Sequence, residues 1–485
     1  MKFLTTQFRG NTLRGRVLRG GAWLGSGSFL EQLSRFGRNM LLARLLMPEV
    51  FGTMAIVLSA GAAIDSFTEI GVREAIIQNP RGGEADFMNS AWWVSFVRAL
   101  VLYALLFTAA PFIASFYGNP QLKPLLRFAL LSLLFTGATS PGAYAAMKDM
   151  RFKRWAAINH GGAIAGVLLT VVLALMWRNV WALAIGFAAE NLFRFLLSYV
   201  ICPFLPRLRM ARTCVREVLE FSKRAVGLPF LNFVFVRADI FVIGKLFAPA
   251  VLGLYSMAIN VAQVPTAFVM NLLGQLLMPT FAHLQDDHRK LNDGLLRVTS
   301  LIACLGSPVV VFAAFSGGQI LRLVYGARYA TMAAPFVMGI FLVLINILNG
   351  QITTVFYAKG TPNLHRRAVG IMAAIMVVLI YPFVHWFGLV GAPAAALLAA
   401  VVGYGFQIAR IRQLTGLRLG EYARALAPAG LLALLVAAVR FGLAPLVPAQ
   451  TFLMPVLPAV IGCLLAYAML LTKPLRRMMV LSGVE

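Results

Sequence analysis

Ionisable residues inside apolar stretches are the residues of this sequence best able to bind charge. The first apolar stretch holds Glu31, Arg35 and Arg38, whose offsets of four and three residues place them on one helical face. A charge in the middle of a membrane span costs roughly 3 kcal/mol, so it normally faces a partner or a cavity. Two arginines with one nearby acid leave a surplus of positive charge. The sequence therefore predicts an anionic partner at this face.

The next apolar stretches add a second group of charges. Asp65, Glu69 and Arg73 follow at successive four-residue steps, which places them on one stripe of a helix. Arg98 lies in the third stretch, where it could reach the membrane surface or pair with Asp65 or Glu69. Both interpretations stay open for Arg98.

Two further pairs of charges lie in later apolar stretches. Glu190 precedes Arg194 by four residues, which is typical of an ordinary ion pair within one helix. Arg237 and Asp239 are two residues apart and cannot share a helical face, so we expect at least one of them to face a cavity between two halves of the protein. The candidates for binding an anionic substrate are Arg35, Arg38, Arg98 and Arg237. The candidates for ion coupling, or for pairing with these arginines, are Glu31, Asp65, Glu69, Glu190 and Asp239.

Arginine in an apolar setting favours a phosphate ligand. Its planar guanidinium group donates two parallel hydrogen bonds and keeps its charge in a low dielectric. A phosphate-bearing lipid or sugar is therefore the expected cargo, whereas a cationic drug would prefer the opposite field. The chain has no GxxxxGK[ST] loop, so ATP is not expected as the direct energy source. We expect no catalytic residue, metal or cofactor, and a proton gradient, a sodium gradient or the membrane potential as the possible driving force.

Composition indicates an all-α membrane protein. Of 485 residues, 60% are hydrophobic and 12% are charged, with a mean hydropathy of +0.81, whereas soluble chains carry about 25% charged residues. The excess of 43 Lys and Arg over 17 Asp and Glu is explained by cytoplasmic loops, which retain basic residues, and does not indicate nucleic-acid binding. About fourteen spans are predicted: 20–46, 50–76, 89–117, 121–147, 156–177, 180–203, 225–247, 250–281, 294–316, 331–357, 364–386, 389–411, 424–446 and 450–472.

The loops between these spans predict an orientation. Every second loop carries basic residues, with the run Lys148 to Arg154 as one example, which places both termini in the cytoplasm. Residues 317–330 form the longest connection on the other side, and their apolar spacing predicts a helix lying at the interface.

One short stretch occurs twice. Five positions agree at a constant offset of 201 residues: Arg44 and Lys245, Leu45 and Leu246, Pro48 and Pro249, Val50 and Val251, Gly52 and Gly253. A base that ends one helix and a Pro that opens the next predict a tight turn between helices. Duplicated halves are common in transporters. We therefore expect two pseudo-symmetric six-helix lobes, residues 1–203 and 204–413, followed by two added helices in residues 414–485.

These stretches also carry a resemblance. Residues 44–52, continued by 64–78, resemble the N-terminal signature of the polysaccharide (oligosaccharidyl-lipid) flippases, the Wzx-type exporters of the multidrug/oligosaccharidyl-lipid/polysaccharide exporter superfamily. Residues 252–258, Pro265 and 278–287 are similar to the pattern of that family's second half, and Tyr325, Gly326 and Arg328 resemble its segment before the tenth helix.

The resemblance implies a two-lobed bundle whose first, second, seventh and eighth helices line a central cavity. It also implies alternating-access transport of undecaprenyl-diphosphate-linked repeat units of O-antigen, capsule or exopolysaccharide from the cytoplasmic to the periplasmic leaflet. The expected partners are this lipid-linked oligosaccharide, the bilayer and possible polymerase and chain-length regulator proteins. A lipid II flippase, a cation-coupled multidrug exporter and, from another class, a glycan polymerase or ligase are the alternatives.

Overall fold

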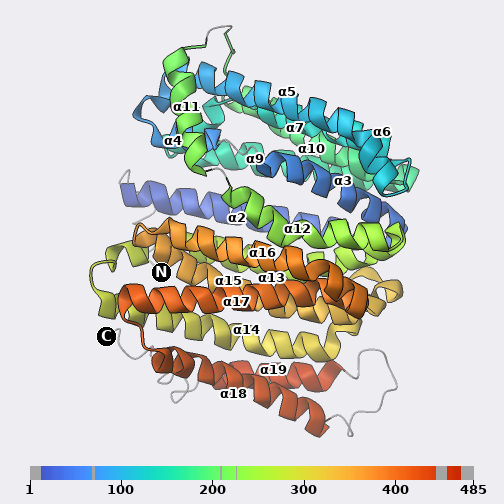
Figure 1. Ribbon diagram of the computed structural model, residues 1–485, viewed down its shortest axis with the longest axis vertical. Helices are drawn as coiled ribbons and strands as arrows, with labels where there is room; N and C mark the ends of the chain where they lie inside the picture. Colours follow the sequence, from blue (N-terminus) through green and yellow to red (C-terminus); the bar gives the residue numbers. More distant parts are fainter. Residues whose placement is uncertain (1–12, 68–70, 208–209, 226, 444–455, 471–485) are drawn as a thin grey trace. The chain divides into compact units, whose positions relative to one another are not determined.

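All secondary-structure elements in the described part of the chain are helices. The computed structural model describes residues 13–67, 71–207, 210–225, 227–443 and 456–470, and every element within these ranges is a helix (Figure 1). Eight helical segments in these ranges are long and apolar enough to cross a membrane, or nine if the bent pair Leu122–Gly137 and Gly142–Lys148 counts as one span. The all-α prediction is thus confirmed for these residues. The number of fourteen spans stays a prediction, although a helix overlaps each predicted range.

The chain forms two compact units with an interleaved boundary. The first unit comprises Met1–Phe233 and Gly244–Gly253, and the second comprises Val234–Ile243 and Leu254–Glu485. The described helices within or entering the first unit are α2 (Leu13–Leu45), α3 (Pro48–Phe67), α4 (Val72–Gln78), η1 (Pro80–Gly83), α5 (Ala85–Phe116), α6 (Leu122–Ala129), α7 (Leu131–Gly137), α8 (Gly142–Lys148), α9 (Phe152–Trp177), α10 (Val180–Ile201), α11 (Arg212–Ala225) and the two ends of α12 (Leu228–Leu246).

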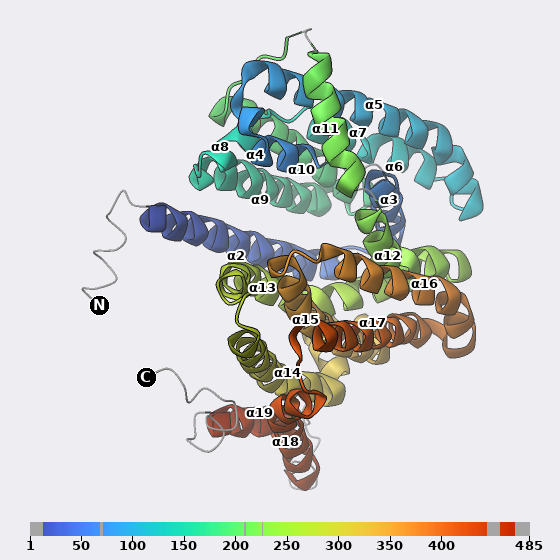
Figure 2. The same cartoon turned by 60° about the vertical axis from the view of Figure 1, so that its left-hand side comes forward.

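The second unit takes the middle of α12 and nearly all of α13. α13 covers Pro249–His283. The other described helices of this unit are α14 (His288–Tyr325), η2 (Ala327–Met332), α15 (Ala333–Ala358), α16 (Pro362–Phe387), η3 (Gly388–Val390), α17 (Gly391–Thr415), α18 (Leu419–Leu443) and α19 (Leu457–Leu470). In the first unit α9 lies beside α10, and in the second α16 lies beside α17 (Figures 1 and 2). Antiparallel neighbours of this kind follow from their short connections.

The repeated stretch forms the same turn twice. α2 ends at Leu45 and α3 begins at Pro48, and α12 and α13 repeat this arrangement 201 residues later. A Cβ atom on Gly52 would lie 1.9 Å from the carbonyl oxygen of Pro249, and one on Gly253 would lie 1.8 Å from the carbonyl oxygen of Pro48. The two turns therefore touch through their backbones in a reciprocal way, which only glycine permits. The predicted helix-turn-helix is confirmed in both copies.

Two predicted spans are interrupted. The predicted helix 50–76 is divided into α3 and α4, with Gly71 between them in the left-handed conformation at φ 59°. The predicted helix 121–147 consists of α6, α7 and α8, with a bend of 53° between the part ending at Gly137 and α8. Pro141 disfavours helical conformation at the residue before it, Ser140. The backbone N–H of Ser140 donates a hydrogen bond to Oγ of Ser198 at 3.0 Å.

The helix predicted at residues 317–330 is for the most part the end of the span before it. α14 continues without a break to Tyr325, and only then does the short η2 follow. The two glycines at 317 and 318 do not end the helix, because Gly317 makes room for α15: a Cβ atom there would lie 3.0 Å from Val337.

One helix was missed in the sequence. α11 lies in a stretch interpreted as a basic loop, and its buried residues Cys214 and Val218 pack against Ile76 of α4 and Phe87 of α5. The side chain of Glu217 on the same helix accepts a hydrogen bond from Asn79 at 2.7 Å. α11 therefore belongs to the first unit, and its alternation of charged and apolar residues hid it among the loop charges.

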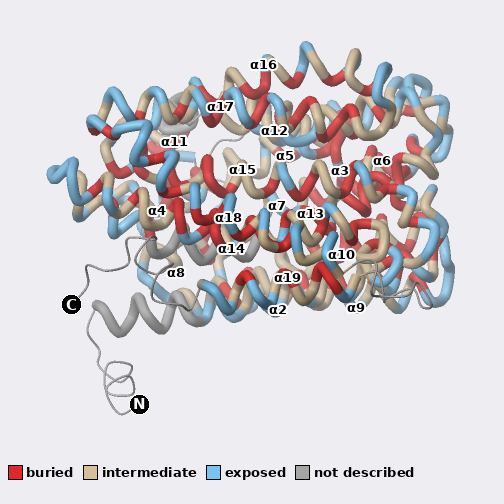
Figure 3. Tube along the Cα trace, turned by 90° about the horizontal axis from the view of Figure 1, so that it is seen from below, coloured by how far each residue is buried: buried red, intermediate tan, exposed pale blue. Residues whose placement is uncertain are grey.

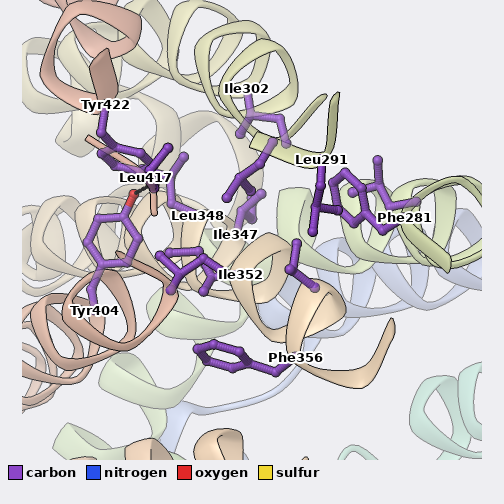
Figure 4. Close-up of a cluster of buried hydrophobic side chains, with 14 of the residues drawn as sticks. Phe281, Leu291, Ile302, Ile347, Leu348, Ile352, Phe356, Tyr404, Leu417 and Tyr422 are labelled. Carbon is purple, nitrogen blue, oxygen red and sulfur yellow. Dashed lines mark hydrogen bonds between the residues drawn. The ribbon is translucent and has the colours of Figure 1, made fainter. Parts of the chain in front are cut away.

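The second unit has an extensive apolar core. Side chains from α13, α14, α15, α17 and α18 meet there, including Phe281, Ile352 and Phe356, which are fully buried (Figure 4). The hydroxyl groups of Tyr404 and Tyr422 form a hydrogen bond at its edge. Along single helices buried positions alternate with exposed ones (Figure 3), because each helix presents one face to its neighbours.

Candidate functional site

Three glycines bring polar side chains of α2, α9 and α10 together in the first unit. A Cβ atom on Gly27 would lie 2.3 Å from the ring of His160, and one on Gly162 would lie 2.4 Å from Cγ of Arg194. A Cβ atom on Gly166 would lie 2.5 Å from Cβ of Glu190. Small residues at helix contacts let backbones approach closely, so polar groups on neighbouring helices come within bonding distance.

Five side chains form a continuous network, which we name the charge cluster: Glu31, Arg35, His160, Glu190 and Arg194. Arg35 donates from Nε to Oε1 of Glu31 at 3.0 Å and from Nη2 to Oε1 of Glu190. Arg194 Nη2 lies 2.9 Å from Oε1 of Glu190 and 3.6 Å from Oε1 of Glu31. His160 Nδ1 lies 2.7 Å from Oε2 of Glu31. Helices distant in sequence are thus joined through two carboxylates.

The cluster is partly buried and balanced in charge, and the side chains of Arg35 and Arg194 are 28% and 27% exposed. The side chains of Glu190, His160 and Glu31 are 6%, 15% and 16% exposed. Two guanidinium groups face two carboxylates, so the formal charge is zero when His160 is neutral. The sequence places one acid, Glu31, beside Arg35 and Arg38 of α2. In the cluster Glu190 of α10 supplies a second acid, and the second arginine is Arg194, not Arg38. Buried ions of this kind require such partners because desolvation of an unpaired charge is costly.

The other predicted residues of the first unit lie outside the cluster. Arg38 donates from Nε and Nη2 to the amide oxygen of Asn39, at 3.2 and 3.1 Å. Arg98 Nη2 on α5 forms an ion pair with Oδ1 of Asp65 on α3 at 2.6 Å, which is one of the two interpretations left open for it. Glu69 lies outside the described residues.

The remaining candidates, Arg237 and Asp239, lie on α12 in the second unit. Asp239 accepts a hydrogen bond from the hydroxyl group of Tyr255 on α13 at 2.8 Å and another from the backbone N–H of Ile240. Its side chain lines a cavity of about 320 Å³ within this unit, together with Gln263. Arg237 is exposed. A carboxylate and a few polar groups in an otherwise apolar cavity are able to hold a small cation or a proton.

Sequence reasoning missed the roles of His160 and Tyr255. The signal for His160 was the small-residue run that follows it, with Gly161, Gly162 and Gly166, because glycines at such spacing indicate a close helix contact. Its partner lies 129 residues earlier, so spacing alone could not identify it. Among the described residues no group of three or more His, Cys, Asp or Glu side chains is arranged to hold a metal ion.

The fold and the charged side chains together indicate a class of protein. α2 and α12 carry most of the charged candidates and are not among the eight apolar segments of the described chain. Charges held inside a bundle of apolar helices are typical of membrane transport proteins, since they mark ion or substrate pathways.

The comparisons with known proteins identify the family. The sequence model described as "Polysaccharide biosynthesis protein" matches residues 41–334, more than half of the chain. The chain belongs to this family, and the resemblance noted from residues 44–78 and 252–287 is confirmed. It is 22% identical over 353 residues to the lipopolysaccharide biosynthesis protein WzxC of Escherichia coli, covering 72% of this chain and 71% of that protein.

A second relative and a solved structure are also similar to this chain. The succinoglycan biosynthesis transport protein ExoT of Rhizobium meliloti is 24% identical over 337 residues, which cover 69% of this chain and 68% of ExoT. The structure of the lipid II flippase MurJ in an inward closed conformation matches with a TM-score of 0.77 at 12% identity, over 94% of this chain and 99% of MurJ. At this identity the last match shows a shared fold. The protein is therefore a multi-pass membrane protein of a polysaccharide biosynthesis family.

Proposed function

We propose that the protein is a flippase that moves undecaprenyl-diphosphate-linked oligosaccharide repeat units from the cytoplasmic to the periplasmic leaflet by alternating access. The observation that carries this proposal is the family match over residues 41–334. ExoT is named as a transport protein and WzxC as a lipopolysaccharide biosynthesis protein, and transport of a lipid-linked precursor is a step that fits both names. The inner membrane, cytoplasmic termini, and a polymerase and chain-length regulator as partners are parts of the same proposal.

In this proposal the guanidinium groups of α2 donate hydrogen bonds to the diphosphate of the cargo. Arg35 and Arg38 lie about one helical turn apart, and a diphosphate offers several oxygen atoms to such donors. In this proposal the diphosphate takes over the donors that Arg35 gives to Glu31 and Glu190 in this structure. The lipid tail stays in the bilayer while the sugar crosses. No covalent step is needed, so the protein acts as a transporter and not as an enzyme.

The alternatives keep the same fold and change the cargo or the reaction. Transport of lipid II is suggested by the fold of MurJ, yet the family match favours polysaccharide precursors. The guanidinium donors of α2 suit an anionic cargo and give a cationic drug no acceptor. The energy source is part of the proposal: a proton gradient, a sodium gradient or the membrane potential, with Asp239 in its cavity as a candidate for coupling.

Deletion of the gene tests the proposal. Lipid-linked glycan would be extracted from the deletion strain and divided by whether it is accessible from the periplasm. Accumulation of intact repeat units on the cytoplasmic leaflet, with loss of surface polymer, supports the flippase. Unpolymerised repeat units in the periplasm would contradict it, because a polymerase or ligase would then be the missing step.

Substitutions test the arginines. We expect Arg35→Ala and Arg38→Ala each to reduce export about 10- to 100-fold, because a hydrogen bond to a charged group is worth about 1.5–3 kcal/mol. Arg216→Ala is the matched control, since Arg216 lies on α11, is exposed and pairs with Glu220 on the same helix. Surface polymer would be measured at equal protein levels in the membrane. Normal export by both α2 variants would refute a diphosphate site on this helix.

A further inference from the structure

Histidine is the one residue type in the charge cluster whose ordinary pKa lies near neutral pH, and His160 is its only example there. An ionised carboxylate can only accept hydrogen bonds, so Nδ1 of His160 donates to Oε2 of Glu31. The neutral ring therefore keeps its lone pair on Nε2. No hydrogen bond to Nε2 is formed by any residue in the described ranges. This nitrogen is free to take up a proton.

The position of the ring is fixed by the fold. A Cβ atom on Gly27 would lie 2.3 Å from Cδ2 and 2.8 Å from Nε2 of His160, so the imidazole lies directly against the backbone of α2. The side chain keeps 15% of its surface exposed. A larger residue at Gly27 would displace the ring from Glu31.

The charged groups around His160 come from two neighbouring helices. On α2 they are Glu31 and Arg35, and on α10 they are Glu190 and Arg194.

The titratable groups of α8 and the earlier part of α9 are engaged elsewhere. Lys148 of α8 donates to backbone oxygens of Asn79 and Pro80, and the Tyr144 ring packs against Trp155. Lys153 lies over the ring of Trp23. Arg154 of α9 lies beside the sulfur of Cys202. Among the described residues, the charged groups joined to His160 by ion pairs are the other four members of the cluster, whose charges sum to zero.

We propose that the His160–Glu31 pair is a proton-binding site, and that protonation of His160 tightens the binding of a diphosphate by the charge cluster. Protonation changes the formal charge of the cluster from zero to plus one. The imidazolium also competes for Glu31, which weakens the hold of this carboxylate on Arg35 and Arg194. Both effects favour an anionic ligand on the guanidinium groups. This inference rests on the proposed function, because it requires a diphosphate-bearing cargo.

The first experiment measures the proton site alone. The full-length protein in lipid nanodiscs, labelled with isotopes at its five histidines, would be titrated between pH 5 and 8 by NMR. The signal of His160 is identified by its loss in His160→Gln. If this variant does not fold, assignment follows from Gln substitutions at the other four histidines. We expect the His160 ring to change protonation state in this range, and a ring that stays in one state would overturn the inference.

The second experiment measures linkage with undecaprenyl diphosphate as the probe. We expect its affinity for the wild-type protein to fall about fivefold or more between pH 5.5 and 8 beyond the change seen in His160→Gln. His283→Gln is the matched control, because His283 is exposed at the end of α13 and should behave as wild type. The titration of the probe's own phosphates is common to all variants. Equal pH dependence in wild type and His160→Gln would overturn the proposal.

The two proposals fail in different ways. If the wild-type protein does not bind the probe at any pH, the diphosphate part of the proposed function fails and the linkage fails with it, while the NMR titration still decides whether His160 takes up a proton. If the probe binds equally well at every pH, the proposed function stands and the linkage is refuted.

Discussion

Replacing Glu190 by Gln would unbalance the charge cluster while leaving its packing intact. Glu190 accepts hydrogen bonds from Arg35 of α2 and Arg194 of α10, and its side chain is 6% exposed. Gln has nearly the same volume and keeps one acceptor oxygen. The variant therefore isolates the loss of one buried negative charge between two guanidinium groups.

The magnitude follows from what remains. Removing one partner of a buried ion pair costs about 3–5 kcal/mol, and we expect about 2–4 kcal/mol here because Glu31 still faces both guanidinium groups. Glu31 lies 3.0 Å from Nε of Arg35 and 3.6 Å from Nη2 of Arg194. The matched control is Glu84→Gln, which removes the acid of the exposed pair with Arg81. Such surface pairs contribute about 0–1 kcal/mol.

Unfolding of the purified full-length protein in detergent micelles measures both variants. Tryptophan fluorescence against denaturant concentration gives the free energy of unfolding relative to wild type. We expect Glu190→Gln to be clearly less stable and Glu84→Gln to resemble wild type. Equal stability of the two variants would refute the view that the cluster holds α2 against α10.

Two other predictions concern stability. Gly166→Ala should destabilise the protein by about 1–3 kcal/mol through overpacking, because its Cβ atom would lie 2.7 Å from Cα of Glu190. Gly405→Ala is the control: its Cβ atom would have no other atom within 4 Å, so the substitution should stabilise α17 by up to about 1 kcal/mol. A change of the same sign in the free energy of unfolding of both variants would contradict this. The backbone N–H of Lys290 donates to Asp287 at the start of α14 and lowers the pKa of that carboxyl group, so its stabilisation is present above the ordinary Asp pKa and is lost as the pH falls through the lowered value. Below about pH 4 the melting temperature of wild type should therefore fall more steeply than that of Asp287→Asn, and parallel curves would count against the cap.

Much of the helical framework could be predicted because apolar runs of about 20 residues form helices in a membrane. The turns at Pro48 and Pro249 were predicted for a local reason, since Pro suits the first helical position. Glu31 and Arg35 were predicted to share a face, and they form an ion pair.

Contacts between distant segments could not be predicted in this way. The ring of His160 fits beside α2 because Gly27 has no side chain to collide with it. This contact with Glu31 can be predicted only if the packing of α2 on α9 is known. α11 was missed because its charges outweigh its apolar face until that face meets α4 and α5. The extension of α14 through Gly317 likewise depends on its packing against α15.

The reciprocal contact of Gly52 and Gly253 decides how the protein can be divided. Since Gly244–Gly253 belongs to the first unit and Val234–Ile243 to the second, no single cut separates the two. A fragment that stops at Phe233 lacks the turn against which Pro48 and Gly52 rest. On the ribosome, too, the first half must wait for the second copy of its turn to emerge before it is complete. The first unit is thus finished only by residues that follow the start of the second.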